Sequence, residues 1–126
     1  MRDYKKYDVW QQSHQLVLAV YKDILPLMPK SEQYELNSQM KRAAYSIPLS
    51  IAEGAGRNTD KDFLRFLDIA LGSANEFEYC MLLSKDLQFL SSEKYEAVNE
   101  KINEIRAKLI NLIKSEMKKF KLNKNL

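Results

Sequence analysis

Apolar residues recur at intervals of three and four along almost the whole of this 126-residue chain. Such spacing gathers them on one face of an α-helix, whereas alternation at intervals of two would indicate a half-buried strand. Turn-forming residues are also scarce, with three glycines and three prolines where an average chain of this length has about fifteen of the two together. Sandwiches, small barrels and other turn-rich folds need more of them. The sequence therefore predicts an all-α fold.

Four long helices are expected, over residues 8–25, 31–54, 59–87 and 92–120, with a basic C-terminal tail at 121–126. The segments between them are short, which makes consecutive helices antiparallel neighbours in a bundle. A chain of 14.8 kDa can build one hydrophobic core. We therefore predict a single domain over residues 1–126, an antiparallel up-down-up-down four-helix bundle.

Particular residues are expected to begin, end or bend these helices. The candidate N-caps, whose side chains can accept a hydrogen bond from the first turn, are Asp8, Ser31, Thr59 and either Ser91 or Ser92. Pro26 and Pro29 close the first helix, and Gly54 and Gly56, which tolerate the left-handed conformation, end the second. Pro48 lies inside the second helix and predicts a kink there. That kink either bends the helix round a neighbour, the interpretation we favour, or frees a carbonyl for a partner.

Some apolar residues lie off the main helical stripes. Ile69 and Leu71 on the third expected helix and Ile110 and Ile113 on the fourth are of this kind. A helix that is apolar over more than one face usually has a second packing partner. These residues predict self-association of the chain.

The stretch from Met40 to Glu76 carries an unusual pattern. It begins with the run Met40-Lys41-Arg42-Ala43-Ala44-Tyr45-Ser46-Ile47-Pro48-Leu49-Ser50-Ile51-Ala52-Glu53-Gly54-Ala55-Gly56-Arg57. After a gap it continues with Phe63, Phe66-Leu67, Ala70, Gly72-Ser73 and Glu76. This resembles the four-helix bundle family encoded within intervening sequences of bacterial 23S ribosomal RNA genes. That family shows R-R-A-x-x-S-I-P-x-N-I-A-E-G-x-G-R followed by F-x-x-F-L-x-x-A-x-G-S-x-x-E, and the N-terminal Tyr7-Asp8-Val9-Trp10-Gln11 resembles its usual opening.

The resemblance implies a bundle that assembles into a ring-shaped homo-oligomer, most often a pentamer, with a biochemical role that is largely unassigned. A related bundle family serves as an RNA-binding accessory to retroelement reverse transcriptases, so nucleic-acid binding is implied by analogy. Two residues depart from the family pattern. Lys41 replaces an arginine and loses its planar fork, and Ser50 replaces an asparagine, which puts any contact made by that amide in doubt.

The residue types needed for catalysis do not occur in suitable combinations. A di-iron bundle needs Glu-x-x-His on two helices, but His14 is the sole histidine and no glutamate precedes it by three residues. Cys80 has no base nearby in the sequence and is expected in the core. The segment Gly54–Arg57 lacks the strand and the Gly-Lys-Ser/Thr ending of a phosphate-binding loop. We expect no catalytic residue, no metal and no cofactor, and therefore no enzyme.

Within the motifs, Glu53, Glu76 and the nearby Glu78 are the carboxylates of interest. A buried salt bridge, or a bond to Arg42 or Arg57 that sets the register of the helices, is favoured over a pair tuned for acid–base chemistry. Pro48, Glu53, Gly54, Gly72 and Glu76 are thus expected to act structurally, Gly72 by allowing close helix contact.

Two groups of cations are candidates for binding nucleic acid. Lys41, Arg42, Arg57, Lys61 and Arg65 are expected around the turn between the second and third helices, and Lys118, Lys119 and Lys121 near the C-terminus. Helix termini and cations together attract phosphate. The alternatives are ordinary solvation, with Arg65 paired to Asp62 or Asp68, and capping of the last helix by its lysines. The net charge of +3 decides nothing by itself.

The preferred hypothesis is a non-catalytic homo-oligomer that binds structured RNA or DNA through phosphate contacts. The alternative is an oligomeric scaffold that binds a protein partner and no nucleic acid. No segment fits a signal peptide or the ~20 apolar residues of a membrane span, and a single cysteine excludes an intrachain disulfide. A cytoplasmic location without membrane association is expected.

Overall fold

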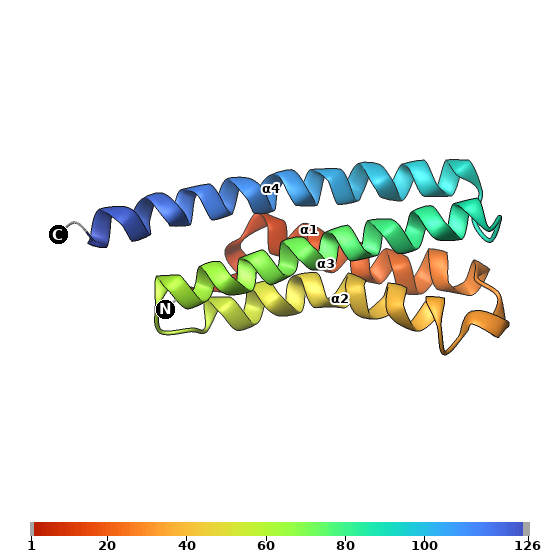
Figure 1. The fold of residues 1–126 in the computed structure, drawn as a ribbon, viewed down its shortest axis with the longest axis horizontal. Helices are drawn as coiled ribbons and strands as arrows, with labels where there is room; N and C mark the ends of the chain where they lie inside the picture. Colours follow the sequence, from red (N-terminus) through yellow and green to blue (C-terminus); the bar gives the residue numbers. More distant parts are fainter. Residues whose placement is uncertain (1, 125–126) are drawn as a thin grey trace.

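A computed structural model describes residues 2–124 and confirms an all-α four-helix bundle (Figure 1). Its helices are α1 (Asp8–Ala19), α2 (Leu36–Ala55), α3 (Asp60–Asp86) and α4 (Ser92–Lys124). In Figure 1 the chain runs along the long axis four times, and each helix points opposite to the one before it. Within the described residues no helix is both long and apolar enough to cross a bilayer.

The first helix ends earlier than expected. After α1, Val20–Ile24 form a π-helical turn in which the amide of Leu25 donates to the carbonyl of Val20, and Leu25–Leu27 form a 3-10 turn. Pro26 has no amide hydrogen with which to continue the α-helical ladder. At the other end the N-cap is Tyr7 rather than Asp8, and its side chain makes no capping hydrogen bond.

The second helix begins five residues later than expected. Ser31, the expected N-cap, lies in a short 3-10 turn (Lys30–Glu32) that follows Pro29. The amide group of Asn37 donates to the carbonyl of Pro29 at 3.1 Å and holds this turn against the start of α2. Pro48 is buried inside α2, which continues through it; the kink there stays a prediction.

The caps of the last two helices agree with the sequence. The hydroxyl of Thr59 accepts a hydrogen bond from the amide of Asp62 at 3.1 Å, and that of Ser91 accepts one from the amide of Lys94 at 3.1 Å. Ser91, not Ser92, is therefore the cap of α4. Residues 121–124, expected as a tail, continue α4, since lysine is a good helix former and favours a helix C-terminus; the last two residues of that tail, 125–126, lie outside the described residues.

The two glycines expected to end the second helix do not do so through a left-handed conformation. Neither adopts a positive φ, and Gly56 has a φ of −83°. Gly54 lies inside α2, where a Cβ atom would stand 2.6 Å from the Cβ of Phe66 and 3.1 Å from the ring of Phe63. It is needed for close packing of α2 on α3, not for a left-handed turn.

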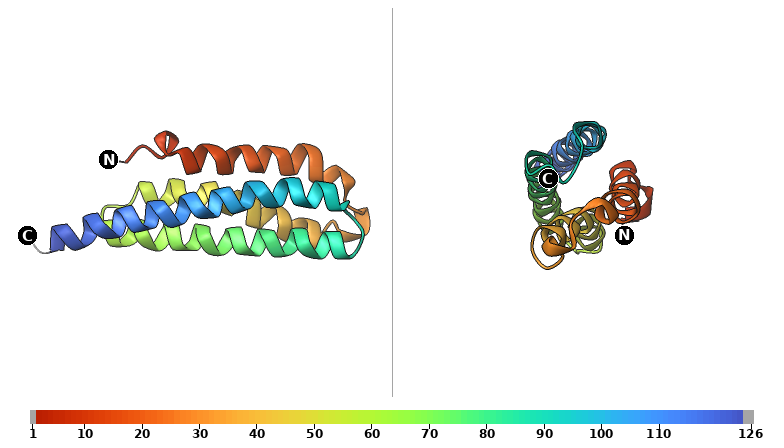
Figure 2. Two further views of the ribbon diagram at one scale, coloured as in Figure 1. Left: turned by 90° about the horizontal axis from the view of Figure 1, so that it is seen from above. Right: turned by 90° about the vertical axis from the view of Figure 1, so that its right-hand side faces the viewer.

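The helices pack in sequence order round one core. Figure 2 shows α2 and α3 side by side, with α1 flanking α2 and α4 flanking α3. The largest fully buried side chains come from all four helices and include Leu16, Met40, Phe77 and Ile105. Contacts between α1 and α4 are few, and a groove lined by Trp10, among others, lies between them. The α2–α3 pair is thus the most extensively packed part of the bundle.

Substituting Gly54 tests this packing. Gly54→Ala should lower the free energy of unfolding by about 1–3 kcal/mol, because the added methyl group collides with Phe66 and Phe63. Urea unfolding followed by circular dichroism measures the change. Gly56→Ala is the matched control, since its Cβ atom meets no atom closer than 3.6 Å, and it should change stability by less than about 0.5 kcal/mol. Equal effects of the two substitutions would contradict this role for Gly54.

Candidate functional site

Cations from two distant parts of the sequence lie at one end of the bundle. Because α4 is longer than α3 and runs antiparallel to it, its last turns lie beside and beyond the α2–α3 turn (Figure 1). Six exposed side chains lie on these segments, and we call them the basic end: Arg57, Lys61, Arg65, Lys118, Lys119 and Lys121. A shallow groove between α3 and α4 at this end is lined by Lys61, Arg65 and Met117, among others.

Two arginines of the basic end are held against one aromatic ring. The guanidinium carbons of Arg57 and Arg65 lie 4.8 and 4.5 Å from the centre of the Phe66 ring. Arg57 also pairs with Glu53, and Arg65 with Asp62, each at 3.7 Å. An exposed ion pair contributes only about 0–1 kcal/mol to stability. Breaking it costs little, so both guanidinium groups can still bind an anion.

The lysines of the basic end differ in their partners. Lys119 pairs with Glu116 at 3.3 Å. Lys61, Lys118 and Lys121 form no ion pair with any part of the chain that the structure describes. These three ammonium groups are therefore free to meet phosphate without first breaking an existing ion pair.

Two of the expected site residues lie elsewhere. Lys41 and Arg42 belong to the second turn of α2, at the end remote from the α2–α3 turn. Since a helix rises 1.5 Å per residue, Arg42 lies about 20 Å along the axis from Arg57. Their expected place around the turn is wrong, because the motif runs along α2 and its two ends lie at opposite ends of that helix.

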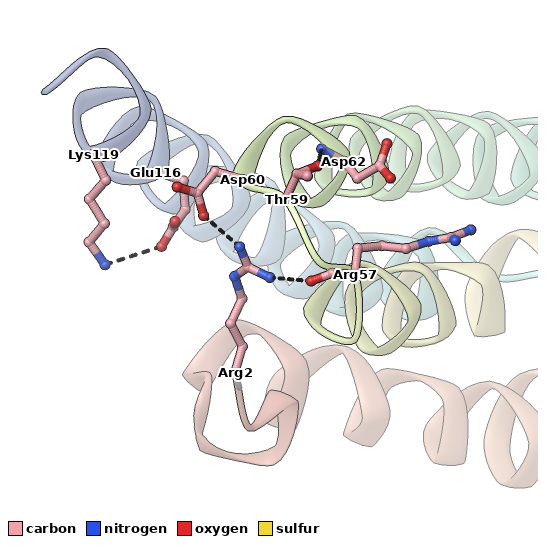
Figure 3. Close-up of polar contacts among 7 residues, drawn as sticks. All are labelled: Arg2, Arg57, Thr59, Asp60, Asp62, Glu116 and Lys119. Atoms are coloured by element: carbon pink, nitrogen blue, oxygen red, sulfur yellow. Dashed lines mark hydrogen bonds and ion pairs between the residues drawn. The ribbon is translucent and has the colours of Figure 1, made fainter. Parts of the chain in front are cut away.

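Arg2 completes this end of the bundle and was missed from the sequence. Its guanidinium group donates to the carbonyl of Arg57 at 2.9 Å and pairs with Asp60 at 2.5 Å (Figure 3). It also lies 4.4 Å from the centre of the Phe63 ring. The N-terminal segment thereby ties down the α2–α3 turn. Because these partners lie more than 50 residues away in the sequence, no local pattern indicates the contact.

A buried carboxylate supports the same region. Glu116 on α4 is only 4% exposed and reaches Lys119 at the surface (Figure 3). Burial, and to a smaller extent the charge of Glu116, raise the pKa of Tyr7 above its ordinary value. The Tyr7 ring in turn packs on Phe63, with ring centres 5.9 Å apart. Glu116 thus makes a polar contact at the edge of the core.

The carboxylates in and near the motifs do not form the register-setting ion pairs expected from the sequence. Glu53 pairs with Arg57, but this exposed pair lies within one segment of the chain and does not set the register between helices. Glu78 pairs instead with Arg106 of α4 at 2.8 Å, and Arg106 also donates to Asn75 at 3.0 Å. Glu76 is exposed and forms no ion pair within residues 2–124, so the pairing expected for it is wrong.

Gly72 also departs from its expected role. A Cβ atom at this position would meet no atom within 4 Å, because Gly72 lies on the outer side of α3. The close helix contact expected there does not occur within the described part of the chain.

The remaining reactive side chains have structural surroundings. Cys80 is buried, and its pKa is raised by burial and by the nearby charge of Glu76. His14 stacks on Trp10, with ring centres 5.1 Å apart. Among residues 2–124 no three histidine, cysteine or acidic side chains gather in a way that could hold a metal ion.

Comparison with known proteins gives a consistent result. Residues 5–111 match the family model described as 23S rRNA-intervening sequence protein. A crystal structure of a protein with unknown function, from the S23 ribosomal protein family of Bacteroides thetaiotaomicron, is similar in fold, with a TM-score of 0.78 and 28% sequence identity. The match covers 84% of this chain and 98% of that one. Comparison with curated proteins finds no match.

The raised pKa of Tyr7 predicts a pH effect. An unfolded chain loses the tyrosine proton near pH ~10, before the folded chain does, so Tyr7 makes stability fall as the pH rises from there through its folded pKa. In Tyr7→Phe this contribution is absent, and the unfolding free energy from urea titrations should fall less steeply between about pH 9 and about pH 11. Tyr34→Phe is the control, since Tyr34 is 85% exposed. If the unfolding free energy of Tyr7→Phe fell with pH as steeply as that of the unsubstituted chain, the raised pKa of Tyr7 would be contradicted.

Proposed function

This chain belongs to the 23S rRNA-intervening sequence protein family, and we propose that it is a non-catalytic, homo-oligomeric bundle that binds structured RNA or DNA at its basic end. The observation that carries the proposal is that six exposed cations, from the α2–α3 turn, the start of α3 and the end of α4, lie at one end of the bundle. Such a surface suits phosphate contacts with little reading of base sequence.

The strength of one copy is limited by its own carboxylates. Arg57, Arg65 and Lys119 each have an acidic neighbour, which leaves three lysines as the uncompensated charges. Three phosphate contacts give weak binding at physiological salt. Linking several copies raises the effective concentration of their sites. A ring-shaped homo-oligomer, such as the pentamer that the family resemblance implies, would therefore bind a nucleic acid that a single copy could not hold.

An oligomeric scaffold that binds a protein partner and no nucleic acid is the second candidate. It is favoured by three exposed apolar side chains, Tyr45 and Leu49 on α2 and Ile69 on α3, since clusters of this kind mark protein–protein contacts. The two candidates make opposite predictions about the lysines of the basic end.

The test is to reverse the three unpaired lysines together. The variant Lys61→Glu/Lys118→Glu/Lys121→Glu leaves every observed ion pair of the bundle in place. Fluorescence anisotropy with a labelled ribosomal RNA hairpin, over a series of salt concentrations, measures the dissociation constant. We expect the dissociation constant at low salt to rise at least tenfold. The slope of log affinity against log salt concentration should become shallower by about one for each lysine–phosphate interaction that the variant removes.

A matched control carries the same charge change at other exposed sites, outside the basic end: Lys22→Glu/Lys30→Glu/Lys94→Glu. If this control weakened binding as much as the test variant, binding would depend on net charge alone. If the unsubstituted chain bound no RNA or duplex DNA at low salt, the nucleic-acid proposal would be wrong and the scaffold would be favoured.

A further inference from the structure

The outer sides of α2 and α3 form one continuous face. Residues three and four apart lie on one side of a helix, and the face consists of Arg42, Tyr45, Ser46 and Leu49 of α2 with Ile69, Gly72, Ser73 and Glu76 of α3. The hydroxyl of Ser73 donates to that of Ser46 at 2.9 Å, which places the two rows side by side. We call these residues the outer α2–α3 face.

The centre of this face is apolar and exposed. Tyr45, Leu49 and Ile69 are 37%, 58% and 42% exposed. Counted from the Ser46–Ser73 contact in antiparallel helices, Leu49 and Ile69 stand at nearly the same level. Tyr45, Leu49 and Ile69 therefore form one patch. An exposed apolar patch on a well-packed bundle usually marks a contact surface.

Gly72 lies within this face. Glycine inside a helix is destabilising relative to alanine, and nothing in the surrounding chain requires it, since a Cβ atom there would meet open space. This contrasts with Gly54, whose place is already filled by Phe66 and Phe63. A bare backbone on an outer helix face allows another helix to approach closely.

The face also carries two opposite charges without partners. Arg42 and Glu76 line the same small cleft between α2 and α3, yet neither forms an ion pair with any described residue. An unpaired cation and an unpaired anion beside an apolar patch are complementary to the same face of another copy. A nucleic acid would suit this face poorly, because its phosphates would meet Glu76 and three apolar side chains.

We propose that the outer α2–α3 face docks a second copy of this chain, with the α2 row of one copy packed on the α3 row of another and Arg42 paired with the other copy's Glu76. The proposal rests on the homo-oligomer part of the proposed function and is independent of nucleic-acid binding. Each copy then offers its α2 row to one neighbour and its α3 row to another, and a heterologous contact of this kind can be repeated from copy to copy and can close into a ring.

Charge exchange tests the contact. Arg42→Glu and Glu76→Arg each place like charges across the interface, and each should raise the concentration needed for half-association at least tenfold. The double variant Arg42→Glu/Glu76→Arg restores the pair in reverse and should recover the association. Sedimentation velocity over a concentration series measures all four proteins, and circular dichroism checks that they remain helical.

A second variant tests the face without changing charge. In Gly72→Trp the new side chain starts in open space in the single chain, so the variant should fold normally. Because that side chain blocks the close approach of another copy, the variant should sediment as a monomer. Glu100→Arg and Lys101→Glu, on the exposed side of α4, are the controls and should associate like the unsubstituted chain.

The outcomes separate this inference from the proposed function. If the chain associates but neither Gly72→Trp nor the charge variants change its association, the outer α2–α3 face is not the interface, while the homo-oligomer stands. If the unsubstituted chain is a monomer at tens of micromolar, both are wrong. If the chain assembles through this face but binds no RNA, the inference stands and the nucleic-acid proposal fails.

Discussion

The close approach of α2 to α3 is the constraint on which the rest of the structure depends. Gly54 lets the α2 backbone approach Phe66 and Phe63, and these two rings then serve the neighbouring elements. Phe63 packs on Tyr7 and lies under the guanidinium group of Arg2, while Phe66 lies under those of Arg57 and Arg65. One tight helix contact therefore positions both the N-terminal segment and the two arginines of the basic end.

Local sequence signals predicted the features that local interactions determine. Periodicity indicated the four helices, and hydroxyl caps placed the start of α3 at Thr59 and that of α4 at Ser91 or Ser92, of which the structure selects Ser91. Three helix ends were wrong. The π-helical turn before Pro26 and the 3-10 turn after Pro29 depend on how the chain packs there, and α4 runs on to Lys124. The contacts of Arg2 could not be predicted, since they join residues more than 50 positions apart.

The candidate site also has parts that the sequence predicts and parts that it does not. The Arg65–Asp62 pair follows from a spacing of three residues, and the arrival of α4 beside the α2–α3 turn follows from antiparallel helices of unequal length. The motif around Lys41 and Arg42 spans α2, so its two ends serve different surfaces: Arg57 belongs to the basic end, and Arg42 to the outer α2–α3 face. We therefore propose nucleic-acid contact at the basic end, to which α4 also contributes, and self-association at the outer α2–α3 face.

The central claim is that copies assembled through the outer α2–α3 face present their basic ends together to a nucleic acid. Sedimentation velocity of a fluorescent, structured RNA titrated with the chain tests it most directly, because the RNA reports the mass of whatever binds it. The account predicts that bound RNA sediments with several protein copies and that Gly72→Trp abolishes this species. RNA bound at full affinity by single copies of Gly72→Trp would contradict it.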